Sequence, residues 1–251
     1  GHIGQGDGEG KVGLELAFNN ELKCDSPRML AAVIDGKNNL VEGLGFRLWE
    51  NRNPHRPYDI ILTIDSKLQA KVESIMDKTI ARGAVVVMDP HNGDILAMAS
   101  RPNYLQSQLS RYLSDGNEYV NYLSSQPFIN RSILSYPPGS VFKIVVAAAA
   151  LDSGIARLST RFFCPGHIEI GNKVFKCQGG SHGEITLAEA FAHSCNTVFI
   201  DLAIRLGKET IYNYASAMGL GKETGIPLGS PEEGGEMRGI MPAPQEMPFL
   251  G

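Results

Sequence analysis

The sequence predicts an α/β fold of the α+β type, in which helices flank a mainly antiparallel sheet. Apolar runs at 83–88 and 95–99 are separated by the turn signal Asn92-Gly93, which is typical of a β-hairpin. Apolar residues at helical spacing indicate helices over 66–81 and 140–151. A length of 251 residues allows one or two domains, each with its own hydrophobic core.

Residues 1–57 are expected to form a separate small module of short strands and loops. This stretch is rich in Gly, Asn and Pro, and its apolar pieces at 29–34 and 40–46 are separated by turn signals such as Asp35-Gly36. The pattern changes near residue 57. We therefore expect a second domain over 58–251.

The second domain is predicted to begin with a strand over 59–64 that runs into the helix over 66–81. Asp65 or Ser66 is the expected N-cap of that helix. In the hairpin that follows, the uninterrupted valines suggest strands covered on both faces. Because a single hairpin is not a stable sheet, at least one further strand should pair with it.

The rest of the chain is predicted to be mainly helical. Residues 101–131 are polar and aromatic, and we expect a loop with short helices there. Helices are then predicted over 140–151, 186–193, 197–206 and 209–218. Three of them are closely followed by a glycine, which is a typical helix stop. The tail from 225 to 251 shows no periodicity.

Composition and charge exclude several classes of protein. Hydrophobic residues make up 43% and charged residues 20%, which is ordinary for a globular protein and excludes a disordered, collagenous or coiled-coil chain. A formal net charge of -4 provides no broad basic field, so nucleic acid is not expected as a partner. The longest apolar run, 144–151, is shorter than the about 20 residues that cross a bilayer. Any membrane anchor is expected outside this chain.

Two cysteines and two histidines gather around a glycine-rich stretch. They are Cys164, His167, Cys177 and His182. Their spacing does not match the paired Cys-x-x-Cys motifs of standard zinc sites, so no metal is expected, although these four residues are the candidates if one binds. A disulfide between the two cysteines and free thiols are the other readings that the sequence leaves open.

Ser140 and Lys143 form a Ser-x-x-Lys motif, whose two polar groups are neighbours on one helical face. The residues before Ser140, Pro137-Pro138-Gly139, place it at the first turn, where unpaired amides favour developing negative charge. Burial of the apolar run that follows would lower the pKa of Lys143 and let it take the serine proton. The same sequence is also compatible with a purely structural helix that is capped at its start and carries an exposed lysine. A Ser-x-x-Lys motif is expected about once by chance in a chain of this length.

A second polar cluster, Ser194-Cys195-Asn196, lies between two predicted apolar helices. Ser194 could relay a proton from Lys143, and the Asn196 amide could bind a peptide-like substrate. Equally, Ser194 could serve only as the N-cap of the helix that follows.

In this order, the motifs resemble the transpeptidase domain of penicillin-binding proteins, which shares its fold with the serine β-lactamases. Four segments carry the resemblance: 62–69, 83–102, 130–143 and 164–207. In addition, residues 10–15, Gly-Lys-Val-Gly-Leu-Glu, are similar to a segment of the non-catalytic module of the class B, monofunctional members. The resemblance implies that 1–57 is the end of such a pedestal module and that 58–251 is part of the transpeptidase domain.

The resemblance implies a peptidoglycan D,D-transpeptidase that is also acylated by β-lactams. Ser140 would be the nucleophile that attacks D-Ala-D-Ala in a stem peptide, and its backbone N–H would supply half of an oxyanion hole. Lys143 is the implied general base, Ser194 the implied proton relay and Asn196 the implied ligand of the substrate amide. No cofactor is implied. The implied partners are stem peptides, β-lactams and other wall-synthesis proteins, at the extracytoplasmic face of a bacterial cytoplasmic membrane.

The third motif of this family, Lys-Thr-Gly or Lys-Ser-Gly, does not occur in the chain. Residues 221–225, Gly-Lys-Glu-Thr-Gly, contain the letters at the wrong spacing. We therefore expect the chain to stop before this motif and to be an inactive fragment of an enzyme. A β-lactam hydrolase or sensor of the same fold and a non-catalytic scaffold in a wall-synthesis complex are the rival functions.

Overall fold

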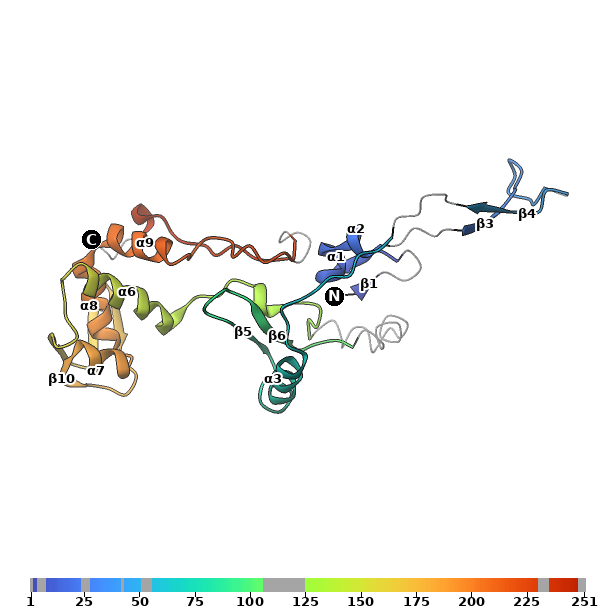
Figure 1. The fold of residues 1–251 in the computed structure, drawn as a ribbon. Helices are drawn as coiled ribbons and strands as arrows, with labels where there is room; N and C mark the ends of the chain where they lie inside the picture. The colour runs from blue at the N-terminus through green and yellow to red at the C-terminus, as the bar shows by residue number, and fades with distance from the viewer. Residues whose placement is uncertain are drawn as a thin grey trace. The chain divides into compact units, whose positions relative to one another are not determined.

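The structure is a computed structural model that describes residues 2–3, 8–23, 28–41, 43–50, 56–105, 125–229 and 235–247. The chain divides into two compact units. Figure 1 shows the chain coloured along its sequence from the N-terminus to the C-terminus. The first unit comprises Gly1–Leu134 and Pro227–Glu236, and the second comprises Ser135–Ile226 and Met237–Gly251. The domain boundary expected near residue 57 stays a prediction.

The first unit begins with short elements, as the turn-rich sequence predicts. They are β1 (His2–Ile3), β2 (Gly10–Val12), α1 (Leu14–Ala17), α2 (Asn19–Leu22), β3 (Arg28–Ala32) and β4 (Phe46–Glu50). β1 pairs with β2, and β3 pairs with β4, both antiparallel. The two helices were not predicted, because four residues each are too few to show a helical period.

The rest of the first unit is a helix against a hairpin. It comprises α3 (Ser66–Thr79), β5 (Gly83–Met88), β6 (Ile95–Arg101) and a 3-10 turn, η2 (Arg131–Ile133). The predicted helix, its N-cap and the hairpin are confirmed: the Asp65 carboxylate accepts hydrogen bonds from the backbone of Lys67 and Leu68, and β5 pairs antiparallel with β6. The predicted loop over 101–131 lies largely outside the described residues.

Two expectations about this part of the first unit are wrong, namely the strand over 59–64 and the covering of the valine run on both faces. Residues 59–64 do not form a strand, because only Thr63 and Asp65 bond to the β6 backbone, at Ile95 and Leu96. No third strand pairs with β5 or β6 in the described part of the chain. Instead, the side-chain amide of Gln69 on α3 bonds to both backbone groups of Met98, as a neighbouring strand would. The valine run is also not covered on both faces, since every second side chain of β5 is exposed.

The second unit is built of helices and short strands. In chain order these are η3 (Gly139–Phe142), α6 (Lys143–Asp152), β7 (Arg161–Cys164), β8 (His167–Ile170), β9 (Lys173–Lys176), β10 (Gly183–Thr186), α7 (Leu187–Ala192), α8 (Asn196–Leu206), α9 (Lys208–Ala217) and η5 (Pro244–Glu246). All four predicted helices are confirmed. The α-helix expected from residue 140 begins only at Lys143, because Gly139–Phe142 forms a 3-10 turn.

The four strands of this unit were not predicted. β8 and β9 form an antiparallel hairpin. β7, which precedes this hairpin in the sequence, pairs antiparallel with β10, which follows it. Every strand pair in the described residues is antiparallel, so the α+β class with antiparallel sheets is confirmed. Four-residue strands are too short to show alternation clearly, and the β7–β10 pairing is not local in sequence.

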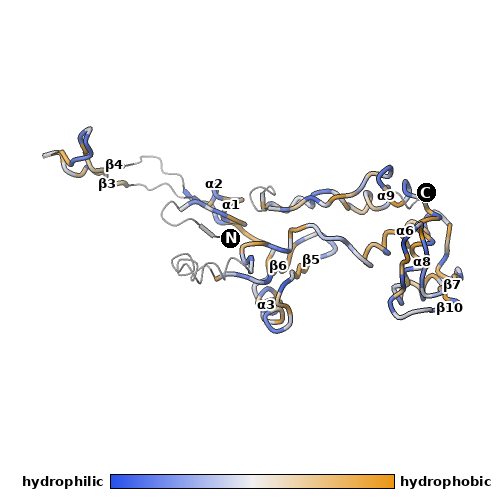
Figure 2. The backbone as a smooth tube through the Cα atoms, turned by 180° about the vertical axis from the view of Figure 1, so that it is seen from behind, coloured by the Kyte–Doolittle hydropathy of each residue, from blue (hydrophilic) through white to orange (hydrophobic). Residues whose placement is uncertain are grey.

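The core of the second unit lies between α6, α7 and α8. α8 packs against α6, α7 and α9 and contacts β7, β8 and β9. The most deeply buried members of the core are Ala149, Ala150, Cys164, Leu187, Ala190, Cys195, Val198 and Leu202. Most of α6 is hydrophobic (Figure 2), and its N-cap residue makes no side-chain capping hydrogen bond. This helix is therefore held in place by burial of its apolar side chains. Among the described helices, none combines the length and the apolar character that a bilayer span requires.

Candidate active site

The ammonium of Lys143 lies between three polar side chains. Its Nζ atom donates hydrogen bonds to the hydroxyl oxygens of Ser140 and Ser194, each at 3.0 Å, and to Oδ1 of Asn196 at 2.7 Å. All four residues belong to the second unit. The structure therefore brings together the complete set of side chains that the two sequence motifs singled out.

Ser140 and Lys143 are placed by the junction between η3 and α6. Gly139 has a φ of +56°, a left-handed conformation that glycine adopts without strain, and the chain then turns into the helix. Behind Lys143, residues such as Val145, Val146 and Ala149 are buried in the core. Ser140 itself is exposed, so its hydroxyl is open to a ligand while its partner is held by a buried helix.

Ser194 has an unusual backbone. Its φ of +51° lies in the left-handed region, which non-glycine residues rarely adopt and which costs about 1 kcal/mol or more. This conformation reverses the chain after α7, so that Cys195, not Ser194, is the N-cap residue of α8. The reading of Ser194 as a simple helix cap is therefore wrong. Its hydroxyl accepts a hydrogen bond from Lys143 instead.

Burial makes Lys143 easier to deprotonate than an ordinary lysine. Removal of water by burial lowers the pKa of the Lys143 ammonium below its usual range, while the nearby thiols of Cys177 and Cys195 act in the opposite direction. The three groups that accept its hydrogen bonds are two hydroxyls and an amide, all of them uncharged. A lysine with a lowered pKa and neutral partners can take a proton from a hydroxyl.

Asn196 connects this cluster to the β8–β9 hairpin. While its oxygen accepts from Lys143, its amide nitrogen donates to the backbone carbonyl of Lys176, the last residue of β9, at 2.8 Å. This bond leaves one N–H hydrogen of the amide for a ligand.

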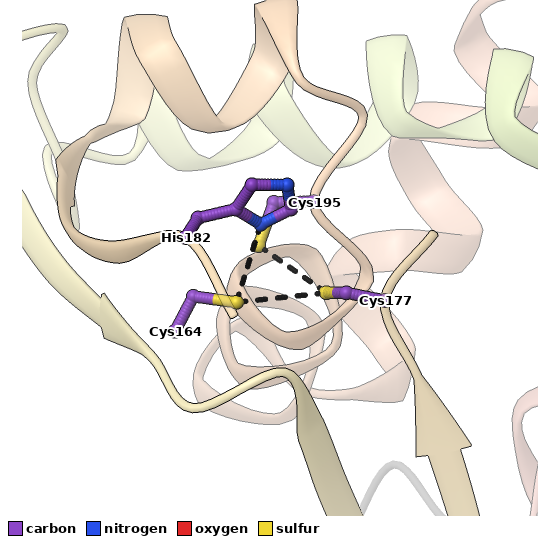
Figure 3. Close-up of side chains that lie close together, drawn as sticks. All are labelled: Cys164, Cys177, His182 and Cys195. Carbon is purple, nitrogen blue, oxygen red and sulfur yellow. Dashed lines mark hydrogen bonds between the residues drawn. The ribbon is translucent and has the colours of Figure 1, made fainter. Parts of the chain in front are cut away.

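A second cluster, the thiol–imidazole cluster, consists of Cys164, Cys177, His182 and Cys195 (Figure 3), and Cys195 lies between Ser194 and Asn196 in the sequence. The Sγ atom of Cys177 is 3.6 Å from that of Cys164 and 3.6 Å from that of Cys195, and Nδ1 of His182 is 3.3 Å from Sγ of Cys164. An S–S bond measures about 2.05 Å, so the disulfide considered from the sequence is not formed and the three cysteines are free thiols.

The sequence identified three members of this cluster and missed the fourth. Cys195 was singled out only as the middle residue of Ser194-Cys195-Asn196, and that position between two site residues was the available signal. His167, the other candidate ligand, is exposed on β8 and does not belong to the cluster.

The thiols of the cluster differ in acidity. Burial raises the pKa of Cys164, but hydrogen bonds from the Thr197 hydroxyl and from the backbone and side chain of His182 outweigh it and lower the pKa to about 6. Burial raises the pKa of the Cys195 thiol to about 11. The cluster therefore contains one sulfur that is readily ionised and one that resists it.

Comparison with known proteins identifies the family. Residues 83–239 match the family model of the penicillin binding protein transpeptidase domain. The chain belongs to this family. It is 32% identical over 237 residues to stage V sporulation protein D of Bacillus subtilis, covering 88% of this chain and 33% of that protein. It is 30% identical over 234 residues to the peptidoglycan D,D-transpeptidase MrdA of Acinetobacter baumannii, covering 90% of this chain and 33% of that protein. The chain thus spans about a third of the length of these relatives.

Solved structures give the same family and fold. The D,D-transpeptidase domain of a peptidoglycan glycosyltransferase from Eggerthella lenta is 33% identical, with a TM-score of 0.67 over 76% of this chain and 44% of that one. Penicillin-binding protein A from M. tuberculosis, solved as a penicillin G acyl-enzyme complex, is 31% identical, with a TM-score of 0.55 over 63% of this chain and 39% of that one. The family resemblance and the fold class are confirmed, whereas the roles of the individual residues stay predictions.

Proposed function

We propose that this chain carries the acylating groups of a peptidoglycan D,D-transpeptidase. The observation that supports this most is the hydrogen bond from the Lys143 ammonium to the Ser140 hydroxyl at 3.0 Å, beside only neutral acceptors. The printed names of the relatives, which include peptidoglycan D,D-transpeptidases, point to the same reaction.

In the proposed acylation, neutral Lys143 accepts the proton of the Ser140 hydroxyl as Oγ bonds to the carbonyl carbon of the penultimate D-alanine. The bond to the nitrogen of the terminal D-alanine then breaks. That nitrogen receives the proton from Lys143 through the Ser194 hydroxyl, and D-alanine leaves. An amine of a second stem peptide attacks the resulting ester in the reverse sequence of proton transfers, which forms the crosslink and frees Ser140.

Ser194 and Asn196 support this chemistry in different ways. Ser194 both accepts from Lys143 and can donate its own proton, which is what a relay requires. Asn196 holds the ammonium in place through Oδ1, and its remaining N–H is the proposed donor to the substrate amide.

The proposed partners are peptidoglycan stem peptides and β-lactams, together with other proteins of wall synthesis. One chain in a structure of a peptidoglycan synthase complex that coordinates polymerization and crosslinking is 25% identical to this chain. The match covers 96% of this chain and 42% of that one, with a TM-score of 0.69. Stem peptides are crosslinked outside the cytoplasmic membrane, so the proposed location is the extracytoplasmic face of that membrane, with an anchor in the parent protein.

Covalent labelling tests the proposal. Full-length protein is incubated with a penicillin and analysed by intact-mass spectrometry and peptide mapping. We expect a stable adduct on Ser140, its loss in Ser140→Ala and its retention in Ser159→Ala, which changes an exposed serine of the same unit. A rapidly hydrolysed adduct would favour the rival function of a β-lactam hydrolase. If no β-lactam formed an adduct, the remaining function would be that of a non-catalytic scaffold.

A further inference from the structure

A polar cavity lies beside the C-terminal half of α9. Its volume is about 400 Å³, which is near the lower end of the range for small-molecule sites. The cavity is lined by α9, by the turn that follows this helix and by residues 238–241. All of these residues belong to the second unit, so the cavity is a feature of that unit alone.

Two glycines bring the walls of this cavity together. Gly221 has a φ of +77°, which glycine adopts without strain. A Cβ atom at Gly239 would stand 3.3 Å from the backbone nitrogen of Gly221, so the two segments touch through their backbones. In addition, Nε of Arg238 donates a hydrogen bond to the carbonyl oxygen of Gly221 at 2.9 Å. The turn after α9 is therefore fixed against the segment 238–241.

The charged groups of the cavity are both positive. Lys222 and Arg238 line it, and no described carboxylate does. The ion pairs within the described residues involve other side chains, so neither cation is neutralised there. The whole chain has a formal net charge of -4, which makes two uncompensated cations at one cavity a local exception. Such a pair attracts an anionic ligand.

The geometry of these groups suits carboxylates. Because Nε of Arg238 is already bonded, the outer edge of its guanidinium, Nη1 and Nη2, is left for two parallel hydrogen bonds to one carboxylate. Lys222 supplies a second positive charge and Tyr212 a hydroxyl, while Leu220 and Met241 add apolar surface. The cavity therefore suits a molecule that has two carboxylates and aliphatic parts.

This cavity is remote from the Ser140 hydroxyl. The hydroxyl of Tyr214 donates a hydrogen bond to the carboxylate of Asp152, so α9 lies beside the C-terminal end of α6. Ser140 precedes the N-terminal end of α6, and ten residues of helix separate the two ends by about 15 Å. In a stem peptide, the D-glutamate lies about three residues from the scissile bond, which a chain spans by at most about 11 Å. A stem peptide held in the cavity is therefore not the one that is being acylated.

We infer that this cavity binds the free carboxylates of a neighbouring stem peptide in the wall. The choice of ligand rests on the proposed function, because stem peptides are the anionic peptides that a D,D-transpeptidase meets. A stem tripeptide with lysine at its third position carries two free carboxylates, one on the D-glutamate and one at its C-terminus. Arg238 pairs with one of them and Lys222 with the other. Binding forms and breaks no covalent bond.

Calorimetric titration with a stem tripeptide tests the site. The probe is N-acetyl-L-Ala-γ-D-Glu-L-Lys with its side-chain amine acetylated, which has no D-Ala-D-Ala to donate and no amine to accept. Full-length protein is first acylated with a penicillin, so that Ser140 is blocked. We expect binding that weakens with added salt, and no binding of the same peptide with both carboxyl groups amidated. Equal binding of the two peptides, or binding of inorganic phosphate but not of the tripeptide, overturns the inference.

Variants locate the binding. Arg238→Gln should weaken the affinity for the tripeptide by about 10- to 100-fold, because hydrogen bonds between charged groups are lost. Arg238→Lys should restore only part of the affinity, because an ammonium cannot form two parallel bonds to one carboxylate. Lys222→Gln should also weaken binding. Arg157→Gln changes an exposed arginine of the same unit outside the cavity and should bind as wild type. Wild-type affinity in Arg238→Gln would show that the peptide binds elsewhere and would overturn the inference.

Acylation and binding are separate measurements, so the inference and the proposed function fail separately. If penicillin acylates Ser140 but the acylated protein does not bind the tripeptide, the inference fails and the proposed function stands. If penicillin never acylates the protein, yet the unmodified protein binds the tripeptide and Arg238→Gln does not, the proposed function fails and the carboxylate site stands.

Discussion

The side-chain amide of Asn196 donates a hydrogen bond to the backbone carbonyl of Lys176 across 2.8 Å. Through its oxygen, the same amide accepts from Lys143 at 2.7 Å. Asn196 thus joins the β8–β9 hairpin to α6. Because Lys176 precedes Cys177 and Asn196 follows Cys195, the thiol–imidazole cluster and the Lys143 cluster are linked through adjacent residues at two points.

Replacing the neutral amide by a carboxylate tests whether the acceptors of Lys143 must be uncharged. In Asn196→Asp, a negative oxygen would stand 2.7 Å from Nζ, which stabilises the ammonium and raises its pKa. We expect slower acylation at neutral pH and a pH–rate profile displaced to higher pH. The profile of Asn196→Ala serves as the control, because that variant loses the contact without adding charge. Equal profiles for the two variants would mean that charge at this position is irrelevant.

Lys143 is expected to account for the general-base contribution. Lys143→Ala should lower the rate of penicillin acylation by about 10²- to 10⁴-fold, the usual range for a positioned base. Lys173→Ala changes an exposed lysine of the same unit and should leave the rate unchanged. Stopped-flow measurement with a chromogenic β-lactam gives both rates. A reduction shared by the two variants would point to a general effect of lost positive charge.

The pH dependence follows from the direction of the Lys143 shift. Burial lowers the pKa of this lysine, and only the neutral amine can accept the Ser140 proton. The acylation rate should therefore rise with pH and level off at a pH below the pKa of an ordinary lysine. Between the folded and unfolded pKa values the unfolded chain binds more protons, so the free energy of unfolding should also rise with pH in that window. Lys143→Gln should show neither dependence.

Prediction from sequence was most successful where a signal is local. The helix behind Ser140 follows from its apolar run, and the neighbourhood of Ser140 and Lys143 follows from their spacing of three. The hairpin over 83–101 follows from two β-prone runs around a turn. In each case the residues that decide the structure are close together in the chain.

The rest of the site depends on pairings that are distant in sequence. Strands β7 and β10 have four residues each and pair across the intervening hairpin, so neither shows its partner in its own sequence. The same pairing brings Cys164 near His182, and the turn at Ser194 adds Cys195. The 3-10 turn at Gly139–Phe142 was mistaken for α-helix because both begin after the same proline and glycine signals.

Burial in the second unit gives a stability prediction. Leu202 is fully buried on α8, whereas Ile204 on the same helix is 40% exposed. Leu202→Ala should lower the free energy of unfolding by about 2–5 kcal/mol, because the cavity it leaves is lined by a well-packed core. Ile204→Ala should lower it by clearly less. Chemical denaturation followed by circular dichroism measures both, and equal losses would contradict the core assignment.

The left-handed backbone of Ser194 allows its conformational and chemical roles to be separated. Glycine tolerates a φ of +51° without strain, whereas alanine does not, so Ser194→Gly should unfold at a higher temperature than Ser194→Ala, by a difference of about 1 kcal/mol in stability. Both variants lack the hydroxyl that accepts from Lys143, and both should be acylated more slowly than wild type. A relay role thus predicts similar losses of rate despite different stabilities. If the glycine variant kept the wild-type rate, the residue would serve only to shape the turn before α8.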